Sequence, residues 1–324
     1  MNRKTLPRID LHCHLDGSLP LLTMQRLLGR QIERSEVQAS TDTQSLTEYL
    51  QKFEIPVQCL QTYENLKAAA FDFMEALQQD KIAYVEVRFA PLLSVHADLD
   101  CRRVIEAVLE GLRCGSERYG IDFAVIVIAM RHHGIAENLQ MLKVAREFLG
   151  YGVGAADLAG DETKYPMHAF EEVFAQVRRW EMPFTIHAGE TGNAENIRRA
   201  IACGAARIGH GIAMRGHEEI KALCRQQGIA LEMCPVSNWQ TKAVSRLQDY
   251  PLREFLEDGL MVTINTDNRT VSGTTIGTEM QFCTEQFGVT DAEILRMQRY
   301  AASAAFTTDA IKHKLCSLWE GNAL

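Results

Sequence analysis

Side chains that bind metals stand at the ends of several apolar segments of this chain. His12 and His14 end the first segment, His187 ends a middle one, and Asp267 follows the last. Three imidazoles and one carboxylate suit zinc and leave a coordination position for water, which is typical of a catalytic site. Because these residues lie far apart in the sequence, they can share one ion only if the fold brings the segment ends together.

Two more candidates stand beside glycines near the ends of similar segments. Glu190 follows His187 by three residues, and His210 lies between two glycines. An H-x-x-E pair on a helix could make Glu190 a further ligand, but Gly189 makes a continuous helix unfavourable there. We therefore expect Glu190 to act as an acid, and His210 as a base or an orienting group. Taken alone, Glu190 would more often be a solvated loop residue, and His210 would more often be a hydrogen-bonded structural histidine.

The elements that could position these residues are short apolar segments of strand length, most of them separated by stretches with helical periodicity. The predicted strands are Arg8 to His14, Ile82 to Phe89, Asp122 to Met130, Gly152 to Leu158, Pro183 to His187, Ala206 to His210, Ile229 to Cys234 and Leu260 to Thr266. Side chains alternate along a strand, so His12 and His14 should share one face. An open, doubly wound sheet would also fit, but about eight strands over this length favour an α/β fold of the (β/α)8 TIM-barrel type.

One gap between the predicted strands is too long for a single crossover. It runs from Ser18 to Lys81 and contains a polar stretch, Ser35 to Thr47, between helix-like segments. We expect this helical insertion after the first strand to form a lid over the carboxyl-terminal face of the barrel. Near the other end, Thr290 and Glu293 form a capping box that predicts the start of a helix. Residues 1–324 are expected to form a single domain.

The composition argues against several classes of partner. The 324 residues are 46% hydrophobic, and 42 acidic against 34 basic side chains give a net charge of −8. That balance disfavours a nucleic-acid polymer or an anionic membrane surface as a partner. The longest apolar run, Phe123 to Met130, is too short to span a bilayer, and the N-terminus lacks a signal-peptide pattern. Nine scattered cysteines without a C-x-x-C pair indicate reduced thiols and a cytoplasmic protein, whose oligomeric state is unknown at this point.

Six short motifs, in this order along the chain, resemble those of the adenosine deaminase family of the amidohydrolase superfamily. They are His12-x-His14-Leu15-Asp16-Gly17, Asp157-Leu158-Ala159-Gly160-x-Glu162, His187-Ala188-Gly189-Glu190, Arg207-Ile208-Gly209-His210-Gly211, Cys234-Pro235-x-Ser237-Asn238 and Asn265-Thr266-Asp267. The resemblance covers nearly the whole chain. It implies a barrel with one zinc ion per chain that converts adenosine and 2′-deoxyadenosine to inosine and 2′-deoxyinosine, releasing ammonia, as in purine salvage.

Residue roles follow from the same resemblance. It implies four zinc ligands, which are His12, His14, His187 and Asp267. Zinc lowers the pKa of bound water to about 7 in favourable sites, so that hydroxide can attack carbon 6 of the purine. Glu190 would then protonate ring nitrogen 1, while His210 would orient the hydroxide and assist proton transfer.

The resemblance also implies contacts with a small purine nucleoside. Gly160 would offer its backbone N–H to the purine, and Asp16, with His14 nearby, would meet a ribose hydroxyl. Gly160 could instead simply turn the chain, and Asp16 could cap a helix. Family members that act on free adenine tend to have Glu at the position of Asp16, which favours a nucleoside. Many members have a second aspartate that pairs with purine nitrogen 7, whereas this chain has Asn268, whose amide can still donate a hydrogen bond.

Other functions remain alternatives to adenosine deamination. The same metal arrangement could deaminate adenine, a modified adenosine or an aminofutalosine-type nucleoside. A barrel without activity, used only to bind a ligand, is a further alternative, although the predicted ligands and Glu190 are all present. Zinc deaminases that act on cytosine carry H-x-E with P-C-x-x-C. No second cysteine follows Cys234 at that spacing, which excludes this class.

Overall fold

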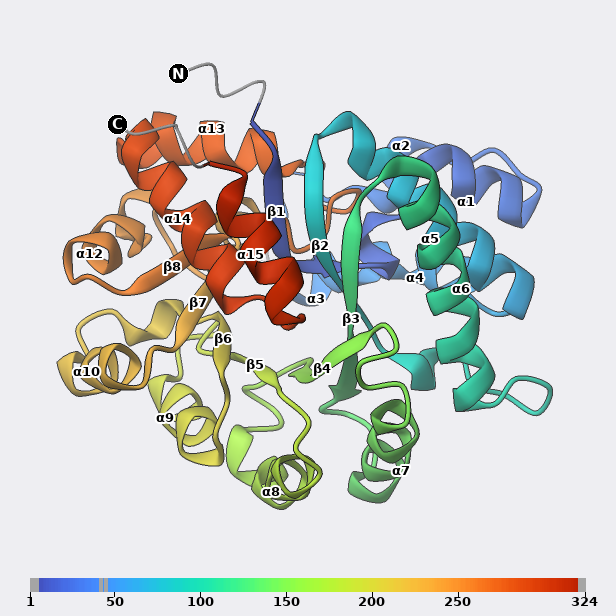
Figure 1. The fold of residues 1–324 in the computed structure, drawn as a ribbon, viewed down its shortest axis with the longest axis horizontal. Helices are drawn as coiled ribbons and strands as arrows, with labels where there is room; N and C mark the ends of the chain where they lie inside the picture. Colours follow the sequence, from blue (N-terminus) through green and yellow to red (C-terminus); the bar gives the residue numbers. More distant parts are fainter. Residues whose placement is uncertain (1–5, 41–42, 44–45, 320–324) are drawn as a thin grey trace.

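The computed structural model describes residues 6–40, 43 and 46–319. The described residues form eight strands, and Figure 1 shows the strands arranged around a ring with helices around the outside. The strands are β1 (Arg8–His14), β2 (Ile82–Phe89), β3 (Asp122–Met130), β4 (Val153–Ala159), β5 (Thr185–Ala188), β6 (Arg207–His210), β7 (Ala230–Met233) and β8 (Met261–Ile264). Each predicted strand is present, and β1 to β3 have the predicted bounds. The last four strands are shorter than predicted.

Two four-stranded parallel sheets make up the ring, in the order β1-β2-β3-β4 and β5-β6-β7-β8. Each seam between the sheets is an isolated parallel bridge, Ala156 with Phe184 at one seam and Cys13 with Asp267 at the other. At the second seam the amide of His14 donates to the carbonyl of Asp267 at 2.7 Å. The amide of Asp267 in turn donates to the carbonyl of His12 at 2.7 Å. The predicted α/β architecture is confirmed, with ladders that are incomplete at the seams.

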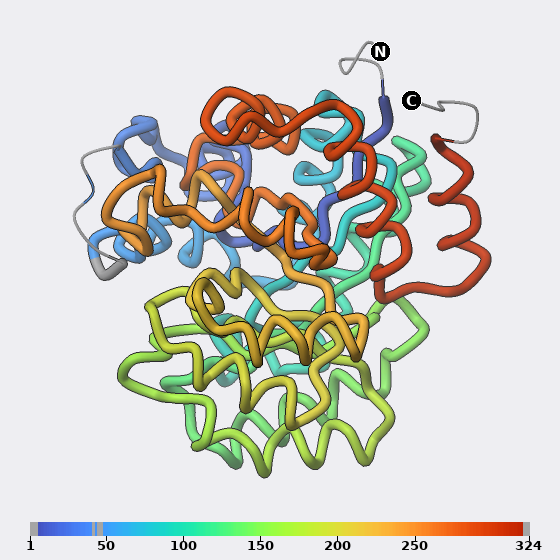
Figure 2. Tube along the Cα trace, turned by 90° about the vertical axis from the view of Figure 1, so that its left-hand side faces the viewer, coloured from blue at the N-terminus to red at the C-terminus, as the bar shows by residue number. Residues whose placement is uncertain are grey.

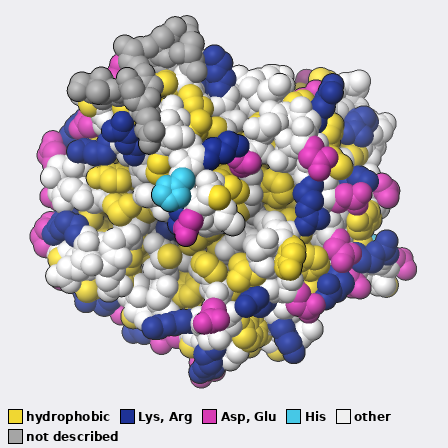
Figure 3. All heavy atoms as spheres, viewed as in Figure 1, with side chains coloured by type: hydrophobic (Ala, Val, Ile, Leu, Met, Phe, Trp, Pro, Cys, Tyr) yellow, Lys and Arg dark blue, Asp and Glu magenta, His cyan; other side chains and the backbone are white. Residues whose placement is uncertain are grey.

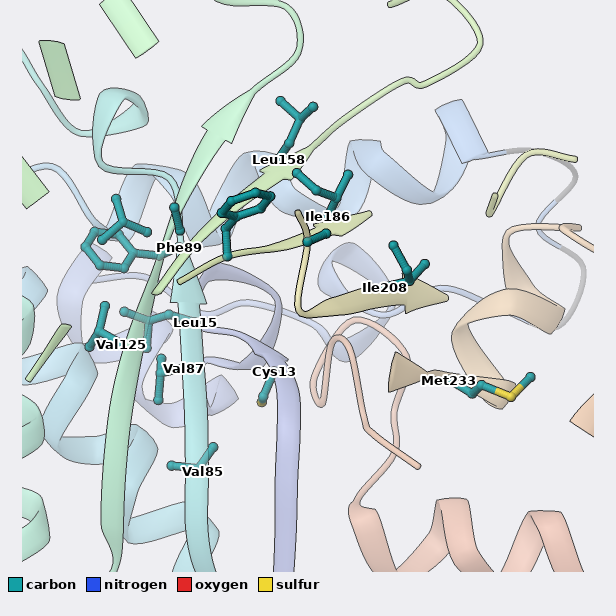
Figure 4. Packing of buried hydrophobic residues seen from close by; sticks show 14 of the residues in the cluster. Cys13, Leu15, Val85, Val87, Phe89, Val125, Leu158, Ile186, Ile208 and Met233 are labelled. Carbon is teal, nitrogen blue, oxygen red and sulfur yellow. The ribbon is translucent and has the colours of Figure 1, made fainter. Parts of the chain in front are cut away.

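Alternation along the strands separates an apolar face from a charged one. Val85, Val87 and Phe89 of β2 belong to the main apolar core, together with residues of the surrounding helices. Figure 4 shows them near apolar side chains from other strands. Glu86 and Arg88, at the intervening positions, are fully buried and hydrogen bond to charged residues of other strands. The interior of the ring is therefore polar, and the apolar core lies between strands and helices.

Helices follow the strands along the chain. After the insertion they are α6 (Cys101–Tyr119), α7 (Ile135–Arg146), α8 (Glu171–Arg179), α9 (Ala194–Cys203), α10 (Glu218–Gln227), α11 (Pro235–Gln240), α12 (Leu252–Glu257), α13 (Ile276–Phe287), α14 (Asp291–Ala304) and α15 (Asp309–Ser317). The predicted capping box is present at the start of α14, where Thr290 and Glu293 bond reciprocally to backbone amides.

The insertion between β1 and β2 is helical, as predicted. It contains α1 (Leu21–Leu28), α2 (Arg34–Val37), α3 (Leu46–Leu50), α4 (Glu54–Cys59) and α5 (Tyr63–Gln79). Most of it lies together on one side of the molecule, in blue and light blue in Figure 2. Part of the polar stretch predicted at Ser35 to Thr47 falls outside the described residues. Tyr49, Phe53 and Val57 line the cavity of the site described below, so the insertion reaches that site.

The visible surface carries charges of both signs. Figure 3 shows acidic and basic side chains interspersed around the edge of the molecule, with apolar patches between them. Among the described residues, no helix combines the length and the apolar character that crossing a bilayer requires. The single domain, the cytoplasmic location and the absence of a polymeric partner stay predictions.

Candidate active site

Metal-binding side chains from four strands or strand ends converge inside the ring. His12, His187, His210 and Asp267 each offer one ligand atom, and these atoms lie within 4.8 Å of one another. His12 Nε2 is 3.4 Å from Asp267 Oδ1. Although these residues come from distant parts of the sequence, the parallel strands end at the same face of the ring, as the sequence analysis required.

His14 joins this group from the end of β1. Its Nε2 atom lies 3.2 Å from His187 Nε2 and 3.3 Å from Asp267 Oδ1. Burial lowers the pKa of both His14 and His187, which favours neutral imidazoles. A neutral imidazole can bind a metal through a ring nitrogen. The donor set therefore fits a divalent metal.

Two carboxylates accept hydrogen bonds from the Nδ1 atoms of His12 and His187. Glu232 Oε2 of β7 accepts from Nδ1 of His12 at 2.8 Å, and Asp157 Oδ2 of β4 accepts from Nδ1 of His187 at 2.9 Å. Each bond places the ring proton on Nδ1 and leaves Nε2 for a ligand. The buried Nε2 of His12 has no hydrogen-bond partner among the described residues. An orphaned acceptor of this kind is satisfied when a metal binds.

Arg88 connects these two carboxylates from the end of β2. Its guanidinium donates to Asp157 Oδ2 at 2.9 Å and to Glu232 Oε2 at 2.8 Å, and all three side chains are fully buried. Arg207 pairs with the other oxygen of Glu232 and with Glu86. Burial alone would raise the pKa of Glu232, but Arg88 and Arg207 outweigh it and hold that pKa well below its usual range. Both carboxylates thus stay ionised as acceptors for the histidine ring protons.

The carboxylate of Asp267 is fixed by its backbone and by two neighbours. Its φ of 58° lies in the left-handed region, which is uncommon for residues other than glycine. The hydroxyl of Thr266 donates to Asp10 at 2.5 Å and holds the preceding residue. Ser237 of α11 donates to Asp267 Oδ2 at 2.5 Å, while Oδ1 faces the histidines. The unusual backbone is thus held in place at a functional position.

His210 differs from the other histidines in its hydrogen-bond partners. Its φ of 62° turns the backbone sharply at the end of β6. Nδ1 lies 3.0 Å from the Nδ2 amide of Asn238, and the Oδ1 of that amide accepts from Tyr250 at 3.2 Å. In this arrangement Nδ1 is an acceptor, so the ring proton sits on Nε2. That Nε2 atom is 3.8 Å from Glu190 Oε2.

Glu190 and His210 perturb each other's protonation in a buried place. Burial raises the pKa of Glu190, which favours the protonated acid. Burial alone would lower the pKa of His210, but the nearby carboxylates of Glu190 and Asp267 outweigh it and raise that pKa. Thr241 also donates to Glu190 Oε1, at 3.4 Å. The two groups lie close enough to influence each other's charge, as is common at sites of acid–base chemistry.

A cavity of about 320 Å³ opens onto this cluster. Each predicted site residue except the fully buried His12 lines it, namely His14, Asp16, Gly160, His187, Glu190, His210, Asp267 and Asn268. The opposite side is mostly apolar, with Leu50, Phe53 and Val57 from the insertion and Ile128 and Met130 from β3. Among the described residues that line the cavity, none is Lys or Arg. The cavity suits a flat, largely apolar, uncharged ligand.

The predicted substrate contacts are placed around this cavity. Burial raises the pKa of Asp16 to about 6, and this carboxyl accepts from the amide of Gly17 at 3.1 Å. Gly160 has a φ of 108°, which a residue with a side chain rarely adopts. Asn268 donates through Nδ2 to the hydroxyl of Tyr49 at 3.0 Å, whereas its Oδ1 has no described partner. The amide of Asn268 is thus already oriented by the insertion.

Comparison with known proteins identifies the family. A family model described as adenosine deaminase matches residues 7–320. The adenosine deaminase of Enterococcus faecalis is 38% identical over 312 residues, which cover 94% of this chain and 93% of that protein. The chain belongs to the adenosine deaminase family. The resemblance drawn from six motifs is confirmed.

Solved structures agree with the adenosine deaminase fold. An adenine deaminase from Arthrobacter aurescens superposes with a TM-score of 0.88 at 21% identity, covering 98% of this chain and 99% of that one. An amidohydrolase from Burkholderia ambifaria, with bound Zn, also has a TM-score of 0.88, at 19% identity over 98% of this chain and 90% of that one. At such identities the likeness shows the fold alone.

Some residues of this adenosine deaminase family site carried no predicted role. The sequence analysis did not single out Arg88, Glu232 or Tyr49, and it gave Asp157 and Glu162 no function although both stand in a motif. A usable signal was present for two of them. Arg88 and Glu232 are charged residues inside strands that are otherwise buried, and such charges need partners. Which residue pairs with Arg88 or Glu232 depends on how the strands are arranged around the ring.

Proposed function

We propose that this enzyme hydrolytically deaminates adenosine and 2′-deoxyadenosine, giving inosine and 2′-deoxyinosine with release of ammonia. The observation that carries the proposal is a buried His/Asp cluster next to a raised-pKa glutamate, in a cavity without Lys or Arg among its described lining residues. Family membership and the curated relative named adenosine deaminase support the same reaction.

We assign the metal, as Zn²⁺, to His12, His14, His187 and Asp267. His12 and His187 support the assignment because their Nδ1 protons are held by carboxylates, which leaves Nε2 available. His210 is left out because its Nδ1 accepts from Asn238 and its Nε2 then carries a proton. When bound, such an ion activates water for attack on an electron-poor carbon. The zinc in the Burkholderia ambifaria amidohydrolase agrees with this choice of metal.

Glu190 is the general acid of the proposed reaction. Attack at carbon 6 places negative charge on ring nitrogen 1, and the protonated carboxyl of Glu190 gives its proton to that nitrogen. Burial raises the pKa of Glu190 and so favours the protonated carboxyl before substrate binds. His210, whose Nε2 faces Glu190 at 3.8 Å, orients the attacking oxygen and assists proton transfer.

The lining of the cavity supports a nucleoside rather than a nucleotide. A 5′-phosphate carries up to two negative charges and needs basic partners, and none of the described lining residues is Lys or Arg. Asp16 in the cavity lining would repel a phosphate, whereas it can accept from a ribose hydroxyl. Gly160 contributes its backbone N–H to the purine, and the amide of Asn268 pairs with purine nitrogen 7. Deamination of free adenine leaves Asp16 without a partner and is the less favoured alternative.

The test is a spectrophotometric assay of the metal-loaded enzyme on adenosine, 2′-deoxyadenosine, adenine and adenosine monophosphate. Turnover of the two nucleosides is expected, with loss of activity after chelation, recovery with Zn²⁺, and loss in His12→Ala. Turnover of adenine alone would replace the proposal with a base deaminase. Metal-loaded protein that is inactive on all four compounds would contradict deamination of these purines.

A further inference from the structure

Glu162 lies in the loop after β4 and has no part in the chemistry described so far. Its side chain is buried, with 3% of the residue exposed, although it is a carboxylate. An ionised carboxylate that is removed from water must be compensated by hydrogen-bond donors. Glu162 therefore has a structural or functional reason to be there, and its partners show which.

The partners of Glu162 surround Glu190 in the sequence. Oε2 accepts from the amide of Gly189 at 2.9 Å, and Oε1 accepts from the amide of Thr191 at 2.8 Å. These are the amides on either side of Glu190. The third donor is Nδ2 of Asn196 in α9, at 2.8 Å from Oε2. One carboxylate thus fixes the backbone on both sides of the proposed acid.

The backbone of Gly189 is also restricted from other directions. Its carbonyl accepts from the amide of Ala213 at 2.9 Å, and its φ is 73°. A Cβ atom at this position would lie 2.4 Å from Cδ1 of Ile197, which is closer than real side chains approach. The loop that carries Glu190 is therefore confined to one position against α9. Glu162 links the loop after β4 to this loop.

Glu162 stands two residues after Gly160 in the same loop. Under the proposed function, Gly160 contacts one edge of the purine and Glu190 protonates another. We propose that Glu162 is a positioning residue that fixes the Glu190 loop against the Gly160 loop and so places the purine correctly for its proton donor. The inference rests on the proposed function, because it assumes that Gly160 and Glu190 contact the same purine. Thr163 and Thr191 add a second contact between the loops, with 3.0 Å between their hydroxyl oxygens.

The first test is Glu162→Gln, which keeps the size of the side chain but replaces one acceptor oxygen with a donor. That NH2 group faces a backbone N–H, so one of the two amide contacts is lost. Hydrogen bonds to charged groups contribute about 1.5–3 kcal/mol, so kcat on adenosine should fall roughly 10- to 100-fold. The metal content should be unchanged. Glu172→Gln, an exposed glutamate in α8, is the matched control and should behave like the native enzyme.

A binding measurement separates positioning from a merely structural role. 1-Deazaadenosine lacks the nitrogen that Glu190 protonates, and 1,3-dideazaadenosine also lacks ring nitrogen 3, which this inference assigns to the backbone N–H of Gly160. Titration calorimetry should show that the native enzyme prefers the first ligand by about 5-fold, as expected for one neutral hydrogen bond. Glu162→Gln should lose this preference, because the Gly160 amide is no longer placed correctly. A variant with native kcat or an unchanged preference would overturn the inference.

A rescue experiment tests the geometry directly. Asn196→Asp brings two carboxylates together and should be as impaired as Glu162→Gln. In the double variant, the introduced glutamine can donate to the introduced aspartate, which can still accept from the amide of Met167, the present partner of Asn196 at 2.8 Å. The double variant should therefore recover part of the lost kcat. A double variant no better than the worse single one would overturn the pairing, whereas a native enzyme inactive on adenosine would instead reject the proposed function.

Discussion

Two regions that face the same cavity are held in place by different kinds of interaction. The pocket floor consists of charged and imidazole side chains from the strands, namely His12, Arg88, Asp157, His187, Glu232 and Asp267. The pocket wall comes from the insertion and consists of Tyr49, Leu50, Phe53 and Val57. Buried polar contacts, which are ion pairs where Arg88 takes part, connect each floor residue to at least one other. The polar contacts of the wall with the floor side pass mainly through Tyr49, whose hydroxyl bonds Ser272 at 2.7 Å and Asn268 at 3.0 Å.

This difference indicates that the floor serves the chemical step and the wall serves substrate binding. Floor residues are fixed before substrate arrives, because each buried charge has a partner and no water needs to reorganise. The wall is apolar and has few polar contacts, which suits a segment that admits and covers a substrate. Changes in the floor should therefore alter kcat or metal affinity, whereas changes in the wall should alter KM.

The largest effect is expected from removing the acid above the floor. Glu190→Gln cannot deliver a proton to the purine, and a positioned acid contributes about 10²–10⁴-fold in rate. We expect kcat to fall by that factor with metal content unchanged, as measured by steady-state kinetics and metal analysis of the same sample. Loss of the metal together with activity would instead place Glu190 among the ligands.

The next effect concerns the carboxylates behind the histidines. Asp157→Asn weakens the bond that orients His187, and partners of metal ligands typically contribute 10- to 100-fold in metal affinity. Glu86→Gln is the matched control, since Glu86 pairs with Arg207 in the same buried network but contacts no histidine. Both variants should lose stability, by up to about 3–5 kcal/mol for a broken buried pair. Chelator competition should show weakened metal binding in Asp157→Asn only, and equal weakening in both would contradict the role of Asp157.

A smaller effect is expected in the wall. Tyr49→Phe removes a hydroxyl that orients Asn268 and bonds Ser272. Each such bond contributes about 1 kcal/mol, so KM for adenosine should rise roughly 5- to 10-fold while kcat stays within about 2-fold. Tyr151→Phe, at an exposed tyrosine far from the cavity lining, serves as the control. A fall in kcat without a change in KM would remove the division between floor and wall.

The smallest effect is expected from a buried carboxyl outside the pocket floor, and it tests whether a buried charge needs a partner in this protein. Glu279 is fully buried and lacks a basic partner among its described contacts, and burial raises its pKa well above the usual value. The folded state therefore keeps a proton that the unfolded chain loses near pH 4.3, so this group favours folding at low pH and the benefit is lost as pH rises. A glutamine side chain does not titrate, so Glu279→Gln does not lose stability in this way as the pH rises. Its stability relative to the native protein should rise with pH, by at most about 1.4 kcal/mol per unit.

Urea unfolding at several pH values between about 5 and 8 measures this difference. Glu257→Gln, at an exposed position in α12, should show a stability curve parallel to that of the native protein. Parallel curves for Glu279→Gln as well would mean that Glu279 is ionised in the folded state. The protein would then hold an unpaired buried charge, and ion pairing would not be what keeps the floor carboxylates ionised.

Much of the fold could be predicted because each strand leaves a local pattern. Apolar runs gave the positions of β1 to β8, and the length of the segment between β1 and β2 indicated the helical insertion. The last strands are shorter than predicted because an apolar run also includes residues that leave the ladder. His210 and Asp267 have positive φ just after such runs, and nothing in the sequence near them announces that conformation.

The candidate site was predictable in its residue types and less so in its partners. His12 and His187 stand at strand ends, which is a local signal. That Glu232 supports one and Asp157 the other depends on which strands lie next to each other across the ring, and no local pattern contains this information. Tyr49 was missed for a similar reason, since a tyrosine on a short helix is most often an ordinary packing residue.

The bridge between Cys13 and Asp267 joins the first strand of the ring to the segment after the last. Its backbone bonds belong to His12, His14 and Asp267, the same residues that are assigned to the ion. Binding of the ion is therefore expected to stabilise the joining of the two ends of the strand series. Removal of the ion should therefore weaken the contact between β1 and the segment after β8. The melting temperature should rise with the free metal concentration.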